Sequence, residues 1–198
     1  MARPKIHDDA LRVRLLDRAG ELLSSEGPDA LSLRRLAGDV GTSTTAVYSL
    51  FGGKPGLLRA LYVEAFRRFG AHLAEVRPTE DPVHDIIELG RAYRASALAD
   101  PHLYSIMFSR PIPGFTPDPE ATAEALATFQ PLVDAVRRAI QQGLFIDEPP
   151  EQIALTAWGT VHGLVSLELS GCLPPGVDVT GMYERALRAG VDGWRRRD

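Results

Sequence analysis

The chain has 198 residues, of which 44% are apolar and 24% charged, so it can bury one good core or two small ones and is not expected to be disordered. Its 22 basic and 26 acidic residues give a net charge of −4, which by itself does not favour a nucleic-acid partner. The single cysteine, Cys172, excludes an intrachain disulfide and a thiolate metal cluster, and fits a reducing compartment.

The charge is uneven along the chain. Residues 1–76 carry 11 Lys or Arg against 9 Asp or Glu, and residues 77–198 carry 11 against 17. The front is therefore mildly basic and the remainder acidic. The first residues lack the apolar run of a signal peptide, and no stretch has the apolar length of a membrane span. We expect a cytoplasmic protein with no membrane partner.

The apolar spacing predicts helices from the start of the chain. Asp8 and Asp9 are expected to cap a first helix that ends near Glu26. Ser32 is expected to cap a short second helix, which Gly41 ends in a tight turn. A third helix of about two turns follows a Ser43 cap, and a glycine pair at residues 52–53 separates it from a long amphipathic fourth helix that begins at Pro55.

The remainder of the chain also has helical spacing and shows no evident strand. We expect a fifth helix at residues 81–98, a sixth at 100–108, a proline-rich loop at 110–119, a seventh ending near Gln142, an eighth between Pro150 and Gly171, and a ninth capped by Asp178. The seventh should be kinked at Pro131, because proline removes one helical hydrogen bond and crowds the preceding turn. The expected fold is all-α, with about nine helices.

The stretch GTSTTAVYSLFGGK, residues 41–54, suggests a helix-turn-helix. Two short helices can cross closely there because Ala37 is small and Gly41 leaves the turn unhindered. Short hydroxyl side chains at residues 42–45 would let the third helix sit deep in a major groove and meet base edges or phosphates. An ordinary three-helix packing unit, whose Ser and Thr residues only cap helices and face solvent, explains the same pattern.

Three other features add to the DNA-binding hypothesis. Lys54 falls at the start of a helix, where a cation opposes the helix dipole but free backbone N–H groups attract anions, and a DNA phosphate would reconcile the two. Tyr48 can reach a phosphate through its hydroxyl, whereas Phe51 fits a core position. Arg3 and Lys5 could follow the DNA backbone or the minor groove, or form a frayed basic tail.

Residues 9–58 resemble the N-terminal domain of TetR-type transcriptional regulators. The resemblance rests on G-x-x-x-L-S-L-x-x-L-A followed by G-T-S-x-x-x-V-Y-x-x-F-x-x-K-x-x-L. It implies that Tyr48 and Lys54 contact phosphates and that residues 42–49 read the groove. Thr42, Ser49 and Gly53 depart from the family pattern, which bears on the individual base contacts. The residues expected to bind DNA are Arg3, Lys5, Ser32, Thr42, Ser43, Thr44, Thr45, Tyr48, Ser49 and Lys54.

Later residues resemble the family's ligand-binding and dimerisation domain, of the class with Trp-x-x-x-His-Gly, here residues 158–163. We expect residues 1–53 to form the DNA-binding domain and residues 54–198 the effector-binding and dimerisation domain, connected by the fourth helix. Small residues on one side of the eighth helix would admit a copy of the chain, so that the eighth and ninth helices of two subunits form a four-helix bundle. The alternative is that they admit only the seventh helix of the same subunit. The expected dimer residues are Leu155, Gly159, His162, Gly163, Ser166, Ser170, Leu187, Val191 and Trp194.

An effector site is expected among mostly apolar side chains with a few polar tips, as in other small-molecule sites, although each of these residues also fits a plain core position. The expected ligand-binding residues are Tyr93, His102, Tyr104, Met107, Phe108, Phe129, Trp158 and His162. The five histidines have no metal-ligand spacing, and no catalytic constellation or phosphate loop is evident. We therefore expect no metal, no cofactor and no enzymatic activity.

Together these features predict a homodimeric DNA-binding regulator of the bacterial cytoplasm, associated with the nucleoid when bound to DNA. The expected activity is repression at a near-palindromic double-stranded operator, with release when a small apolar or amphipathic effector binds. Two alternatives stay open: a helical adaptor that binds protein through its acidic part, and an enzyme built in the C-terminal cavity.

Overall fold

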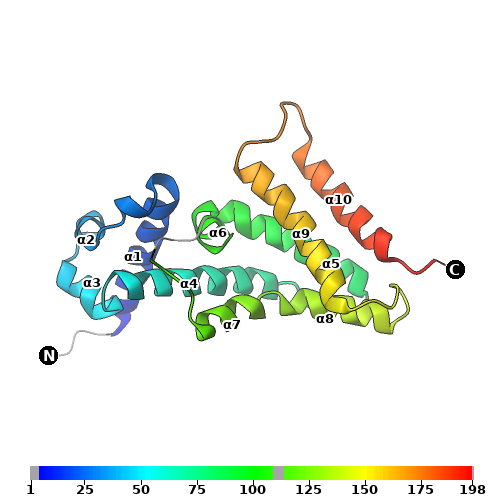
Figure 1. Cartoon of the computed structure of the whole chain (residues 1–198), viewed down its shortest axis with the longest axis horizontal. Coiled ribbons are helices and arrows are strands. Elements are labelled where there is room, and N and C mark those ends of the chain that lie inside the picture. The colour runs from blue at the N-terminus through cyan, green and yellow to red at the C-terminus, as the bar shows by residue number, and fades with distance from the viewer. Residues whose placement is uncertain (1–4, 109–113, 198) are drawn as a thin grey trace. The chain divides into compact units, whose positions relative to one another are not determined.

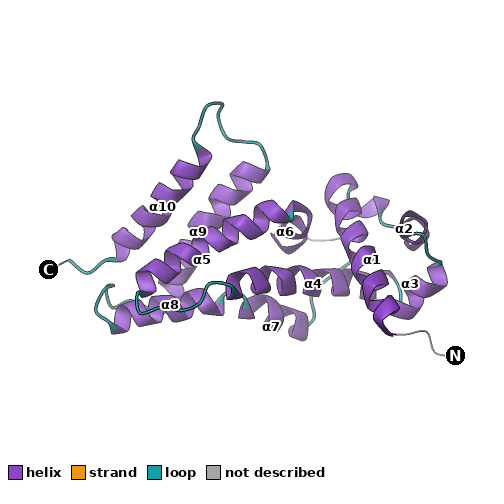
Figure 2. Cartoon of the chain, turned by 180° about the vertical axis from the view of Figure 1, so that it is seen from behind, coloured by secondary structure: helices purple, strands orange, loops and turns teal. Residues whose placement is uncertain are grey.

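A computed structural model describes residues 5–108 and 114–197, with the backbone alone at residues 5–7. Within these residues the chain forms ten α-helices, one short 3-10 helix and no β-strand (Figure 2). The helices are α1 (Lys5–Glu26), η1 (Pro28–Ala30), α2 (Leu33–Val40), α3 (Thr44–Phe51), α4 (Lys54–Ala74), α5 (Pro82–Ala99), α6 (Pro101–Phe108), α7 (Pro119–Ala127), α8 (Gln130–Gln141), α9 (Pro150–Leu169) and α10 (Val179–Trp194). The predicted all-α fold class is confirmed.

Local signals account for most helix boundaries. Ser32 Oγ accepts a hydrogen bond from the Arg35 backbone N–H at 3.2 Å, and Ser43 Oγ accepts one from Ala46 at 3.1 Å, so both predicted caps are present. Gly41 ends α2 with φ 72°, a left-handed conformation that glycine adopts without a Cβ clash.

Two predicted boundaries were wrong. Helix α1 begins at Lys5, before the expected cap, and Asp8 lies in its first turn, where its carboxylate complements the helix dipole. The expected seventh helix is two helices, α7 and α8, separated by a turn at residues 128–129. Pro131 lies in the first turn of α8, where a missing N–H costs no helical hydrogen bond, so the chain breaks before the proline instead of kinking at it.

Contacts divide the chain into two compact units. Unit 1 comprises residues 1–68 and 100–125, and unit 2 comprises residues 69–99 and 126–198. The helix-turn-helix segment therefore shares a unit with α6 and most of α7. This division describes packing, and the functional boundary expected between residues 53 and 54 stays a prediction.

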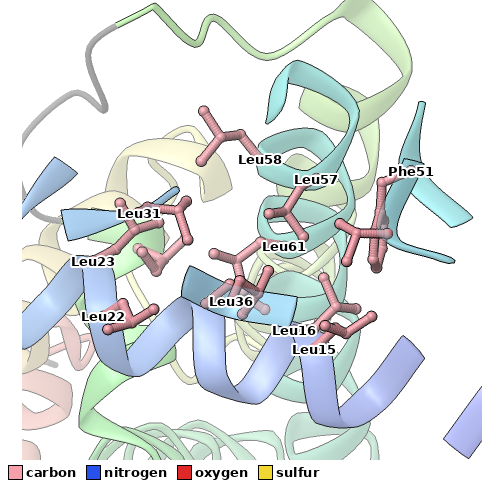
Figure 3. Close-up of a cluster of buried hydrophobic side chains, with 14 of the residues drawn as sticks. Leu15, Leu16, Leu22, Leu23, Leu31, Leu36, Phe51, Leu57, Leu58 and Leu61 are labelled. Carbon is pink, nitrogen blue, oxygen red and sulfur yellow. The ribbon is translucent and has the colours of Figure 1, made fainter. Parts of the chain in front are cut away.

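The core of unit 1 is built from leucines of α1, α2 and α4. Leu15, Leu16, Leu36 and Leu61 have no exposed surface, and Figure 3 shows Leu36 and Leu61 pointing toward α1. Phe51, at the end of α3, belongs to the same cluster. Because burying a leucine contributes about 1.5–3 kcal/mol, this cluster holds the two short helices in place despite their length.

Helix α5 is central to unit 2, where it contacts α8, α9 and α10. Helices α9 and α10 lie side by side (Figure 1). Tyr183 of α10 donates a hydrogen bond to the Gly90 carbonyl at 2.7 Å, and Arg91 pairs with Glu184 at 2.8 and 2.5 Å. Among the described residues, none of the helices combines the length and hydropathy needed to cross a membrane.

Candidate functional site

Helix α3 has a buried side and an exposed side. Val47 is fully buried and Phe51 is 8% exposed, so these two residues fix the helix to the core of unit 1. On the other side four polar side chains are exposed, namely those of Thr44, Thr45, Tyr48 and Ser49. Their spacing of one, three and four residues places them on one helix face. The face that the sequence predicts to read DNA is thus open to solvent.

The N-terminus of α4 lies beside the end of α3. A Cβ built on Gly53 would lie 3.6 Å from Tyr48 Cε1, so the tyrosine ring rests next to the residue that precedes Lys54. Tyr48 is 57% exposed, which is unusual for a large aromatic side chain. Lys54 Nζ donates a hydrogen bond to the Pro28 carbonyl at 3.3 Å, which leaves two of its three N–H donors for another acceptor.

The other predicted DNA-binding residues flank this face. Ser32 and Ser43 are exposed and use their hydroxyl groups as helix caps. Thr42 is half-buried, and its backbone N–H donates to the Ala37 carbonyl at 2.8 Å. Arg3 lies outside the described residues, and Lys5 is the first residue of α1, without a described side chain.

Two arginines near the helix-turn-helix are neutralised within the chain. Arg35 of α2 pairs with Glu26 through two bonds of 2.7 and 2.8 Å, and this guanidinium lowers the pKa of the Glu26 carboxyl. Arg18 of α1 pairs with Asp39 at 2.8 Å and with Glu21 at 2.9 Å. Two of the 11 basic residues at the front of the chain are therefore already paired with carboxylates of the same molecule.

The eight predicted ligand-binding residues divide between the units, four in each. In unit 2 the four form one connected set: the Tyr93 hydroxyl and His162 Nδ1 are hydrogen-bonded at 2.9 Å, and the Trp158 ring lies 5.7 Å from His162 and 6.0 Å from Phe129. Burial lowers the pKa of His162 and favours its neutral ring. This set is mostly apolar with a polar pair at one end.

In unit 1 the other four ligand-binding candidates all come from α6. His102 Nδ1 is hydrogen-bonded to the Ser24 hydroxyl of α1. The Tyr104 and Phe108 rings lie 5.1 Å apart, and Met107 packs against the leucine core. These contacts fit both the core and the ligand-binding interpretation, so the predicted roles stay predictions.

Most of the predicted dimer residues on α9 are exposed or lie beside open space. Leu155 is 54% exposed, and a Cβ built on Gly159 or Gly163 would meet no atom within 4 Å. No described helix of the same unit therefore fills the space beside these glycines. Ser166 is half-buried, and Ser170 is exposed at the end of α9.

On α10 the predicted dimer residues turn inward. Leu187 and Val191 are buried in their own unit, and Trp194 is half-buried. Leu187 packs on Gly90 of α5. The helical spacing places these residues on one face of α10, and at Leu187 α5 of the same unit covers that face. Among the described residues, no group of three or more His, Cys, Asp or Glu could hold a metal ion.

Comparison with known sequences agrees with this arrangement. The sequence model described as "Bacterial regulatory proteins, tetR family" matches residues 15–61, which contain the helix-turn-helix. The model described as "Tetracyclin repressor-like, C-terminal domain" matches residues 86–190, more than half of the chain. The chain belongs to the TetR family. The resemblance predicted from the residues of α2, α3 and the start of α4 is confirmed.

The chain is similar to mycobacterial regulators. HTH-type transcriptional regulator Rv1816 of Mycobacterium tuberculosis is 27% identical over 143 residues, 68% of this chain and 59% of that protein. The uncharacterized HTH-type transcriptional regulator Rv0681 of the same species is 26% identical over 187 residues, 94% of this chain and 82% of that protein. The chain thus spans 59% of the length of the first curated relatives it matches.

The fold is also similar to solved structures. A protein of unknown function from Rhodococcus sp. RHA1 is 30% identical, with a TM-score of 0.81 over 94% of this chain and 96% of that one. A TetR family transcription regulator from Marinobacter aquaeolei VT8 is 21% identical, with a TM-score of 0.79 over 98% of this chain and 100% of that one. The second similarity concerns the fold alone.

Two residues of this TetR-family site were missed from the sequence. A Cβ on Gly56 would lie 1.9 Å from the Phe51 carbonyl oxygen, so only glycine lets the first turn of α4 approach the last turn of α3. A glycine just inside a long amphipathic helix was the available signal. The Arg12 guanidinium of α1 lies 5.9 Å from the centre of the Phe51 ring, a contact that no local pattern predicts.

Proposed function

We propose that this protein is a transcriptional repressor that binds double-stranded DNA through α3. The observation that carries the proposal is the exposed polar face of α3, held by Val47 and Phe51 on its other side. Short Thr and Ser side chains let a helix approach base edges closely, while Tyr48 and Lys54 at the neighbouring helix end would bind phosphates. The free backbone N–H groups at the start of α4 would favour the same phosphate.

A homodimer is part of the proposal. Leu155, Gly159, Gly163 and Leu167 follow one another at four-residue spacing on α9, and Leu167 is 45% exposed. The neighbouring hydroxyls of Thr156 and Thr160 donate to carbonyls one turn earlier, at 2.9 and 3.0 Å, so covering them leaves no donor unsatisfied. This face could pack closely against its copy, and two α3 helices about 34–36 Å apart would then match successive major grooves.

The buried positions of Leu187 and Val191 favour a smaller interface than the sequence alone indicates, centred on α9. A Gly159→Leu variant should then raise the dissociation constant of the dimer, measured by sedimentation, without lowering the melting temperature of the monomer. A parent protein that is monomeric at micromolar concentration contradicts the dimer.

The effector in this proposal is a small apolar or amphipathic molecule. Its contacts would include the aromatic set of Tyr93, Phe129, Trp158 and His162, whose hydrogen-bonded pair offers polarity within an apolar surrounding. The effector must bind more tightly to the conformation that does not fit the operator, since equal affinity for both conformations would not shift the equilibrium between them.

The test begins with enrichment of genomic fragments by the purified protein. Binding to the enriched fragment should fall steeply with salt, and Lys54→Ala should weaken binding to all sequences about equally and reduce the salt slope by about one. Thr44→Ala and Thr45→Ala should change the preferred sequence instead. Once a fragment is enriched, a screen for its release would identify effectors. Enrichment of no fragment would instead contradict DNA binding and favour a protein partner.

A further inference from the structure

Helix α4 is joined to the start of α7 by a two-point ion pair. Arg59 Nε donates to Asp118 Oδ2 at 2.5 Å, and Arg59 Nη2 donates to Glu120 Oε2 at 2.6 Å. Arg59 lies five residues after Lys54 on α4, whereas both acids belong to the N-terminal end of α7. All three residues lie in unit 1.

Asp118 has a second role in the same place. Its Oδ1 accepts a hydrogen bond from the Ala121 backbone N–H at 2.8 Å, and its carbonyl accepts one from Thr122 at 2.9 Å, so this residue caps α7. The Arg59 guanidinium and this capping bond together lower the pKa of the Asp118 carboxyl. A displacement of Arg59 therefore acts directly on the group that starts α7.

Neighbouring contacts fix the same segment to α4. The Phe115 ring, three residues before Asp118, lies 5.5 Å from the Tyr62 ring of α4. Arg59 and Asp118 are 40% and 42% exposed, and an isolated pair of this kind contributes little to stability. Its significance is geometric, because the paired arginine orients a carboxylate that a helix start also uses.

A second junction repeats the arrangement one helix earlier. Arg68 of α4 pairs with Asp17 of α1 at 2.8 Å and lies 3.8 Å from Asp100. Asp100 in turn caps α6 by accepting the Leu103 backbone N–H at 3.0 Å. The helices that follow both capping aspartates are therefore connected to α4 through arginines.

We propose that Arg59 and Asp118 are positioning residues that couple the DNA-bound state of α4 to the start of α7. The inference rests on the proposed DNA-binding function and assigns its regulation to a junction within unit 1. A shift of α4 that aligns Lys54 with a phosphate moves Arg59 with it, because both lie within two turns of one helix. Coupling between sites is reciprocal, so DNA must alter the first turn of α7 to the extent that α7 alters DNA binding.

This reciprocity allows a test without an effector. Hydrogen exchange of the Ala121 and Thr122 amides is measured in the parent protein with and without the double-stranded fragment that it enriches from genomic DNA. DNA should change their exchange rates by about fivefold or more. Arg59→Gln should abolish most of this response. Asp118→Asn should do the same while retaining the cap, because asparagine caps helices as well as aspartate.

Arg67→Gln is the matched control. Arg67 is also an α4 arginine, but its described ion pair is with Glu64 on its own helix, so the response of α7 should be unchanged. If the parent binds DNA without a change in the exchange of Ala121 and Thr122, the coupling is overturned and the proposed DNA binding stands. The same follows if Arg59→Gln and Asp118→Asn show a response as large as the parent's. A parent that binds no DNA overturns the proposed function and this inference with it.

Discussion

Replacing Gly90 by alanine should disturb the attachment of α10 to α5. The new Cβ would lie 2.4 Å from Leu187 Cδ2, and 3.4 and 3.5 Å from its Cδ1 and Cγ. Carbon atoms in contact prefer about 3.5–4.0 Å, so the leucine must move by about 1 Å. Leu187 is only 8% exposed and cannot swing freely into solvent. Overpacking of this kind costs about 1–3 kcal/mol, offset by about 1 kcal/mol from the better helix propensity of alanine.

Because these two effects partly cancel, the informative quantity is a double-mutant cycle. Leu187→Ala alone should cost about 2–5 kcal/mol, since it leaves a cavity. In the Gly90→Ala background the same change should cost about 1–3 kcal/mol less, because it also relieves the clash. Urea denaturation at one fixed protein concentration measures all four free energies of unfolding. Additivity within about 0.5 kcal/mol would refute the packing argument.

Three further changes test other parts of the structure. Gly56→Ala should lower the free energy of unfolding by at least about 3 kcal/mol, because the Phe51 carbonyl oxygen cannot move away from the new Cβ as a side chain could. A melting temperature equal to that of the parent would contradict this. Gly38→Ala, at an exposed position of α2 with no atom within 4 Å of the new Cβ, should instead raise the stability by about 1 kcal/mol in the same measurement, so a loss would show an unseen contact. Glu64 is buried, and its pairing with Arg67 and Arg68 lowers its pKa from 4.5 to about 2. The ionised carboxylate therefore adds at most about 3 kcal/mol to the free energy of unfolding above pH 4.5, and this contribution is lost as the pH falls toward 2. Glu64→Gln should therefore destabilise the protein at pH 7 and flatten this part of the pH dependence of unfolding, and an unchanged acid profile would contradict the role of the carboxylate.

The helix-turn-helix was predictable because its signals are local. Ser32, Gly41 and Ser43 each determine a boundary through hydrogen bonds or backbone angles within a few residues of their own position. The break between α7 and α8 was less predictable, since a proline near a helix start and a proline at a kink produce the same sequence pattern.

The contacts that determine the roles of other residues are not local. Arg59 and Asp118 are 59 positions apart, and Gly90 and Leu187 meet only when α5 and α10 pack together. Leu187 was predicted to lie in the dimer interface, but a sequence does not distinguish an apolar residue covered by the same chain from one covered by a copy. The same ambiguity applied to the ligand-binding candidates, because aromatic side chains serve cores and ligand sites equally well.

The two-sided character of α3 has a consequence for how such a regulator can change. The residues that attach this helix, Val47 and Phe51, are separate from the four that face outward. Substitutions at residues 44, 45, 48 and 49 can therefore alter what the surface contacts while leaving the buried anchor intact. A library that varies these four positions should consist mostly of folded proteins. If α3 binds DNA as proposed, variants with new sequence preferences can then be selected without first repairing stability.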